Sequence, residues 1–343
     1  MNGFERIMAA LNGNPHDRIP IMLHNFMMAA KEHGVTMKQY RDSPKVIAES
    51  FIASIEKYQY DGILVDIDTV TLAGSLGVLI DFPEHEPARP LSGKLKSSEN
   101  VQNLKPIKVE NYKYIQIWLE AVMLLKDFFC NEIMIRGNCD QAPFSLASMM
   151  RGTEAMMMDL CVAKPAQLTE LFDYCTEATC QFIRLMVQAG AHMVSNGDSV
   201  AGPDMISPEL YEQYALPYEK KVVDEAHKFG VPYALHICGN TELIMELMLK
   251  TGADAFEIDY KTDIYKAFDI LHDKITFIGN IDPSGVIALG TKELVKKKTI
   301  ELLDVFSKTN RFVLNSGCAI PCNAPAENIY TLVETAKTYN IVM

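Results

Sequence analysis

Residues 232–240 read Pro-Tyr-Ala-Leu-His-Ile-Cys-Gly-Asn, a short apolar run that ends in a histidine, a cysteine and a glycine. Residues two apart in a strand point to the same face, so His236 and Cys238 can present an imidazole nitrogen and a thiolate to one metal ion. A second apolar run, residues 312–318, ends in the same manner at Cys318. If the carboxyl ends of these two strands lie together, three ligands converge and leave a fourth position open, as in catalytic zinc sites.

Further short apolar runs alternate with long amphipathic stretches along the chain. Helical periodicity marks residues 165–189, 208–229 and 292–308, and two of these begin with proline, which a first helical turn tolerates. Eight parallel strands alternating with helices predict an α/β fold, a single (β/α)8 TIM barrel domain over residues 1–343. The other strand candidates are residues 19–26, 62–68, 133–140, 192–198, 255–260 and 275–282.

Two segments fall outside this alternation. An N-terminal extension precedes the first run, and residues 69–132 hold a stretch rich in glycine, proline and charge, residues 74–99, before the next helix. We predict that this stretch is an insertion after the second strand, lying over the barrel mouth and forming no separate domain.

Polar residues end almost every apolar run. In such a barrel the active site is built at the carboxyl ends of the strands, so the chemistry is expected at one mouth. Asp140, Asn196 and Asp198 are candidate catalytic residues that accept a proton or position the substrate, and Glu257 is a candidate fourth metal ligand. Each has an alternative explanation as a turn former, a helix cap or a hydrogen-bond partner within the mouth. Glu257 has a further alternative explanation, because a carboxylate can orient a metal ligand without binding the metal.

The composition limits the class of partner. The net charge of -12 comes without a basic stripe to offset it, which argues against a nucleic-acid partner. The first residues do not resemble a secretory signal and no run of eighteen apolar residues occurs, so we expect a cytoplasmic protein with no membrane span. Eight cysteines without regular spacing do not indicate a disulfide framework.

These motifs resemble the uroporphyrinogen decarboxylase superfamily, and within it the zinc-dependent cobamide methyltransferases. The resemblance implies a (β/α)8 barrel with zinc held by His236, Cys238 and Cys318, and a corrinoid as cofactor. The decarboxylases of the superfamily differ: they carry an arginine-rich segment after the first strand and a histidine where this chain has Cys318. The matching stretches are residues 4–7, 18–20, 206–211, 236–240, 279–283, 317–321 and 325–328.

The resemblance favours methyl transfer over two alternatives. Residues 24–30 contain no arginine, whereas a substrate with eight carboxylates would need positive charge, so a decarboxylase-like lyase is the less favoured enzyme. A non-enzymatic metal-binding or corrinoid-binding protein is the other alternative, and an open coordination position argues against it. Zinc as a mild Lewis acid suits either direction: demethylation of a methoxylated or otherwise methylated donor by Co(I), or methylation of a thiol such as coenzyme M.

The sequence says less about the second substrate and the partner protein. The sequence lacks the cobalamin-binding pattern Asp-x-His-x-x-Gly, so we expect the corrinoid on a separate protein or as a free cofactor. Five methionines in residues 148–159 form either an adaptable docking surface or core filling. Arg136 and Arg151 are the nearest cations by sequence, too few for a firm anion clamp, so an uncharged methyl donor such as a methoxyaromatic compound fits better than an anionic thiol.

Overall fold

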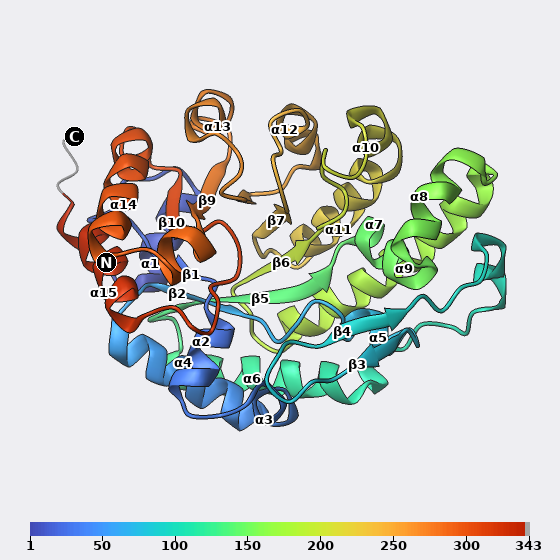
Figure 1. The fold of residues 1–343 in the computed structure, drawn as a ribbon, viewed down its shortest axis with the longest axis horizontal. Coiled ribbons are helices and arrows are strands. Elements are labelled where there is room, and N and C mark those ends of the chain that lie inside the picture. The colour runs from blue at the N-terminus through green and yellow to red at the C-terminus, as the bar shows by residue number, and fades with distance from the viewer. Residues whose placement is uncertain (340–343) are drawn as a thin grey trace.

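A ring of eight parallel strands forms the centre of the protein, whose computed structural model describes residues 1–339 (Figure 1). Each strand pairs with the next one along the ring, and a parallel bridge between Ile21 and Leu314 joins the last strand to the first. The predicted α/β fold, a (β/α)8 TIM barrel, is therefore confirmed. The barrel strands are β1 (Met22–Leu23), β2 (Gly62–Val65), β5 (Met134–Gln141), β6 (Met193–Gly197), β7 (Tyr233–Ile237), β8 (Ala255–Ile258), β9 (Thr276–Ile281) and β10 (Phe312–Ser316).

Helices surround the ring, as the alternating pattern predicts. One expected helix, residues 208–229, is wrong: it divides into α10 and α11 at Ala215, because Pro217 stands in the first turn of α11 and has no N–H to continue a helix. The helices are α1 (Gly3–Leu11), α2 (Phe26–Glu32), α3 (Met37–Asp42), α4 (Pro44–Tyr58), α5 (Thr71–Ser75), α6 (Lys113–Phe129), α7 (Pro143–Arg151), α8 (Thr153–Val162), α9 (Pro165–Gln188), α10 (Pro208–Tyr214), α11 (Leu216–Lys228), α12 (Met245–Met248), α13 (Ile264–Leu271), α14 (Lys292–Phe306) and α15 (Ala326–Thr338). Short helical turns cover Ser98–Asn103, Val109–Asn111, Leu249–Thr251 and Pro283–Ala288.

The N-terminal extension closes the amino end of the barrel. Helix α1 packs its apolar face into a layer of side chains drawn from seven of the eight strands. The eighth strand, β2, contributes Gly62, where a Cβ atom would come within 2.5 Å of Ile7. Glycine is therefore required there so that α1 can enter. The layer comprises Ile7, Ala10 and Leu11 of α1 with Met22, Met134, Met193, Ala234, Ala255, Ile278 and Val313.

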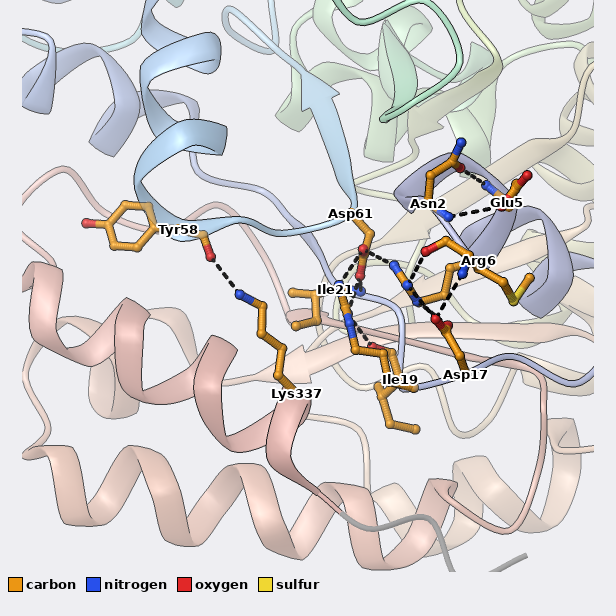
Figure 2. A network of polar contacts seen from close by, with 11 residues as sticks. Asn2, Glu5, Arg6, Asp17, Ile19, Ile21, Tyr58, Asp61 and Lys337 are labelled. Atoms are coloured by element: carbon orange, nitrogen blue, oxygen red, sulfur yellow. Dashed lines mark hydrogen bonds and ion pairs between the residues drawn. The ribbon is translucent and has the colours of Figure 1, made fainter.

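A buried carboxylate anchors α1 to the barrel (Figure 2). Asp61 precedes β2 and pairs with Arg6 of α1 at 2.5 Å and with Arg18 at 2.7 Å. Its second oxygen also accepts the N–H of Ile21, 2.9 Å away. Both charges of the Arg6–Asp61 pair are almost fully buried, whereas Asp17, the other partner of Arg6, is 46% exposed.

The insertion after β2 forms an antiparallel hairpin, β3 (Leu79–Asp81) with β4 (Arg89–Ser92). Arg41 of α3 donates to the carbonyl oxygens of Pro83 and Glu86 in the hairpin loop. Pro87 of the same loop lines the cavity at the carboxyl ends of the strands. Part of the insertion thus reaches the mouth, and the position of the whole stretch over it stays a prediction. Across residues 1–339, no helix is both long and apolar enough to cross a membrane.

Candidate metal centre and active site

Three side chains from two strands meet at the barrel mouth. His236 lies in β7, Cys238 directly follows that strand, and Cys318 lies just beyond β10. Their candidate ligand atoms all lie within 4.8 Å of one another, and Cys238 Sγ is 3.3 Å from His236 Nε2. Because β7 and β10 are three places apart in the ring, its curvature brings the two ends toward each other. The predicted convergence of these residues is therefore present in the fold.

The donor set fits zinc. Nδ1 of His236 lies 2.9 Å from the main-chain carbonyl oxygen of Glu257 and donates to it, which leaves Nε2 facing the sulfur atoms. Hydrogen bonding from Cys318, aided by His236, lowers the pKa of the Cys238 thiol to about 3. Although burial opposes it, Cys238 in turn raises the pKa of His236 to about 10. One imidazole and two cysteines suit zinc far better than magnesium or calcium, which prefer oxygen ligands.

Glu257 stands beside this group with its carboxylate engaged elsewhere. Its Oε2 is 2.5 Å from Arg136 Nη1, and its Oε1 is 3.4 Å from His24 Nδ1. Burial works against ionisation, but Arg136 and His24 lower the pKa of Glu257 below its ordinary value. Among residues 1–339 the close group of ligand atoms does not include Glu257. Its role as fourth ligand stays a prediction, and its main-chain contact makes it an orienting residue for His236.

His24 links Glu257 to a second carboxylate. Its Nε2 lies 2.8 Å from Asp66 Oδ2, and the other oxygen of Asp66 accepts from Asn138 at 3.0 Å. Burial would lower the pKa of His24, but Asp66 and Glu257 raise it to about 9. His24 therefore carries a charge between two carboxylates.

Asp140 and Asn196, predicted as catalytic residues, both line the mouth cavity. Asp140 Oδ2 accepts the N–H of Leu72 at 2.6 Å, and Oδ1 has no hydrogen-bond partner within residues 1–339 although the residue is 1% exposed. Burial, followed by the charge of Asp68, raises the pKa of Asp140 well above its usual range. Asn196 donates to the carbonyl oxygen of Cys139, so its amide is fixed by the barrel wall.

Asp198, the third predicted catalytic residue, lies outside the cavity lining. Its Oδ1 accepts the N–H of Ser145 at the start of α7, 2.7 Å away, and its carboxyl group shares a hydrogen bond with Glu219 of α11. Tyr211 donates to the second oxygen of Glu219 at 2.5 Å. Burial raises the pKa of Asp198 to about 6 and that of Glu219 well above its ordinary value. This pair holds α7 and α11 against β6, and a catalytic role for Asp198 stays a prediction.

The cavity between these groups has a volume of about 210 Å³, enough for a small ligand. The two predicted cations are both engaged, since Arg136 pairs with Glu257 and Arg151 pairs with Asp159 at 2.7 Å. The lining side chains are Phe26, Met27, Leu64, Pro87 and Ala319 on the apolar side, and His24, Asp66, Asp68, Thr69, Arg136, Asn138, Asp140, Gln141, Asn196, Ser199, His236, Cys238, Glu257 and Cys318 on the polar side.

The methionines of residues 148–159 divide between the two predicted uses. Met150 and Met156 are fully buried and belong to the core, whereas Met158 of α8 is 59% exposed. Two other exposed apolar side chains follow barrel strands, Leu243 after β7 and Leu289 after β9. Part of the mouth rim is therefore apolar.

Several residues of the site received no individual role from the sequence. His24, Asp66 and Asp68 end the first two apolar runs, a signal that marks them as mouth residues without indicating their partners. Glu219 lies within a helical pattern, and nothing in the sequence pairs it with Asp198.

Comparisons with known proteins agree with this geometry. The profile of the family described as uroporphyrinogen decarboxylase (URO-D) matches residues 2–339. The chain is 30% identical over 340 residues to the methylcobamide:CoM methyltransferase MtbA of Methanosarcina acetivorans, with 98% of this chain and 97% of the relative covered. It is 28% identical over 356 residues to a uroporphyrinogen decarboxylase of Prochlorococcus marinus, with 97% and 96% covered. A solved methyltransferase from Methanosarcina mazei superposes with a TM-score of 0.89 at 22% identity, covering 98% of both chains.

Proposed function

Because this chain belongs to the uroporphyrinogen decarboxylase (URO-D) family and carries a His/Cys/Cys group at its barrel mouth, we propose that it is a zinc-dependent methyltransferase. It moves a methyl group between a small substrate and the cobalt of a corrinoid. The observation that carries the proposal is the convergence of His236, Cys238 and Cys318 within 4.8 Å in the lining of the mouth cavity. The name of the Methanosarcina acetivorans relative, a methylcobamide:CoM methyltransferase, supports the same reaction class.

His236, Cys238 and Cys318 would hold the metal. Zinc, when bound, supplies Lewis-acid chemistry that stabilises negative charge on a substrate sulfur or oxygen. The carbonyl oxygen of Glu257 keeps the His236 ring in place, and the apolar wall with Phe26 and Met27 excludes water from the reacting methyl group. Asp140 and Asn196, which also line the cavity, would position the substrate.

The corrinoid would arrive on a separate protein or as a free cofactor and meet the substrate at the open mouth. Exposed apolar side chains that follow barrel strands, Leu243 and Leu289, support a docking face at the rim. The cytoplasmic location expected from the sequence stays a prediction.

Two observations favour opposite directions of methyl transfer. The relative's name describes transfer to coenzyme M, an anionic thiol, whereas Arg136 and Arg151 are both held in ion pairs and leave little to clamp an anion. We therefore keep demethylation of a methylated donor, such as a methoxylated compound, as the preferred direction. Methylation of a thiol of the coenzyme M type is the alternative.

The test is to measure zinc content and then assay both directions with the zinc-loaded protein. Methylcobalamin is offered with thiols, and Co(I)-cobalamin is offered with methoxyaromatic compounds and methylated thioethers, while the corrinoid absorbance is followed. We expect one zinc per chain and turnover in at least one direction. Cys318→Ala should abolish turnover, and Cys130→Ser, which changes an exposed cysteine after α6, should not. Porphyrinogen decarboxylation without any methyl transfer would instead support the lyase alternative.

A further inference from the structure

The cationic side chains of the cavity are already neutralised. Among the lining residues, which all belong to the described part of the chain, the basic side chains are His24, His236 and Arg136, and His236 would be occupied as a zinc ligand. His24 lies between Asp66 and Glu257, and Arg136 lies 2.5 Å from Glu257. An anionic ligand would have to break these buried ion pairs, which is costly because each leaves an uncompensated charge.

Asp68 and Asp140, also in the lining, have the opposite imbalance. Asp68 Oδ1 accepts the N–H groups of Val70 and Thr71, each at 2.9 Å, and Asp140 Oδ2 accepts that of Leu72. The first turn of α5 thus fixes both carboxylates by one oxygen each. Asp140 Oδ1 accepts no hydrogen bond of standard geometry within residues 1–339, although the residue is 99% buried, and its nearest side-chain donor is the amide of Gln141.

Gln141, the next residue in the chain, has a second acceptor without a hydrogen-bond partner. Gln141, also in the lining, is 2% exposed, and its side-chain oxygen Oε1 has no hydrogen-bond partner among the described residues. Buried polar atoms in folded proteins are nearly always paired, so two orphan acceptors on one wall of a cavity indicate that a ligand supplies the donors.

We infer that the substrate of this site carries an ammonium or similar cationic, hydrogen-bond-donating group, which binds between Asp140, Asp68 and Gln141. The inference rests on the proposed function and names its substrate class: a small amine that also bears the sulfur or oxygen exchanging the methyl group. The His/Cys/Cys group with zinc would take that heteroatom, and the acidic wall would take the amine.

Charge balance favours this class over neutral and anionic ones. Two thiolates would cancel the charge of the zinc, and Asp66 and Glu257 cancel those of His24 and Arg136. Asp68 and Asp140 then remain without a counter-cation, and burial followed by the charge of Asp68 raises the pKa of Asp140, which favours its neutral form in the empty site. A cationic substrate would favour the ionised form of both carboxyl groups, whereas the sulfonate of coenzyme M would place a negative charge beside them.

The experiment compares three thiols of equal length that differ in charge: mercaptoethylamine, mercaptoethanol and mercaptoethanesulfonate, which is coenzyme M. Binding to the zinc-loaded protein is measured by calorimetry. We expect the amine to bind about tenfold or more tightly than the alcohol, and the sulfonate to bind most weakly. Thiols differ in intrinsic zinc affinity, so the deciding quantity is the ratio of amine to alcohol affinity compared between variants.

Asp140→Asn and Asp68→Asn should each reduce this ratio about tenfold. Asparagine keeps an oxygen for the N–H of Leu72 and tolerates the positive φ of 61° at position 140. Asp269→Asn, on the exposed face of α13, removes the same charge elsewhere and should leave the ratio unchanged. Equal ratios in all variants would overturn the inference.

The S-methyl forms of the same compounds, offered with Co(I)-cobalamin, decide whether the amine substrate donates or accepts the methyl group. A preference for coenzyme M that disappears in Arg136→Gln would show that Arg136 leaves Glu257 to bind anions, and would overturn the inference while the proposed function stands. Failure of every thiol and thioether to bind, together with no methyl transfer from methoxyaromatic compounds in the zinc-loaded protein, would instead overturn both.

Discussion

Nδ1 of His236 donates to the main-chain carbonyl oxygen of Glu257, the residue directly opposite it in the neighbouring strand β8. One strand pairing therefore sets two features of the site. The carbonyl group orients the imidazole, and the side chain of the same residue binds Arg136 and His24. The candidate metal ligands and the charged residues of the cavity are coupled through a single backbone position.

Metal removal should lower stability only where the three ligands are intact. We expect a chelator to lower the melting temperature of the wild-type protein, and added zinc at about a hundredfold over its Kd to raise the unfolding free energy by roughly 3 kcal/mol. Cys318→Ala should fold, because the barrel core is formed elsewhere, but should respond to neither reagent. Differential scanning calorimetry with metal analysis tests this, and full zinc occupancy in Cys318→Ala would contradict the ligand assignment.

The anchor of α1 should be a strong stability determinant. Asp61→Asn leaves Arg6 and Arg18 partly uncompensated in a buried setting, so we expect a loss of about 3–5 kcal/mol in the unfolding free energy. Asp17→Asn, which removes the exposed partner of Arg6, should cost less than about 1 kcal/mol. Urea unfolding measures both free-energy losses. Equal losses would show that the burial of Asp61 does not set its contribution to stability.

His192 should make stability depend on pH near the amino end of the barrel. Burial, aided by the charge of Lys126, lowers the pKa of His192 from 6.5 to about 4. Between these values the unfolded chain binds the proton and the folded chain does not, so stability present above about pH 6.5 is lost as pH falls toward 4. Since the ring is partly exposed, we expect a loss of only about 1 kcal/mol from this group.

Urea unfolding at pH 7 and at pH 5 checks the contribution of His192. His192→Gln removes the titrating ring and should flatten part of the slope. An unchanged slope in this variant would assign the acid sensitivity to other groups.

The Asp198 and Glu219 pair should tolerate an amide but not an apolar residue. Glu219→Gln can still donate to Asp198 and accept from Tyr211, so we expect a change below about 1 kcal/mol in the unfolding free energy. Glu219→Leu leaves Asp198 and Tyr211 without this hydrogen-bond partner in the core, and should lower the unfolding free energy by about 2–4 kcal/mol. A large loss in both variants would mean that the pair needs its ionised form.

The strands and the metal-ligand group are predictable because their signals are local. Alternation in a strand puts His236 and Cys238 on one side, and a Gly-Cys pair after another apolar run marks Cys318 as the end of an equivalent strand. The signal for the break at Ala215 is also local, because Pro217 interrupts a helix at this point. The helical periodicity on both sides of Pro217 favoured one continuous helix instead.

Partners across elements could not be predicted. Whether Glu257 faces the metal or Arg136 depends on the register of β8 against the strands around it, and a one-residue shift would reverse its side chain. Asp198 looked like a mouth residue because it ends a strand, but its side chain turns outward to α7 and α11. The sequence does not indicate where the helices lie in enough detail to predict these hydrogen bonds.

Closure of the barrel floor by α1 has a kinetic consequence. With Ile7 and its neighbours filling the amino end, the proposed substrate and corrinoid would both have to reach the cavity from the opposite rim. A corrinoid protein seated on that rim would block it, so the small molecule must enter first and leave last. Initial-rate measurements should then show a compulsory order, with inhibition when the corrinoid protein is in excess.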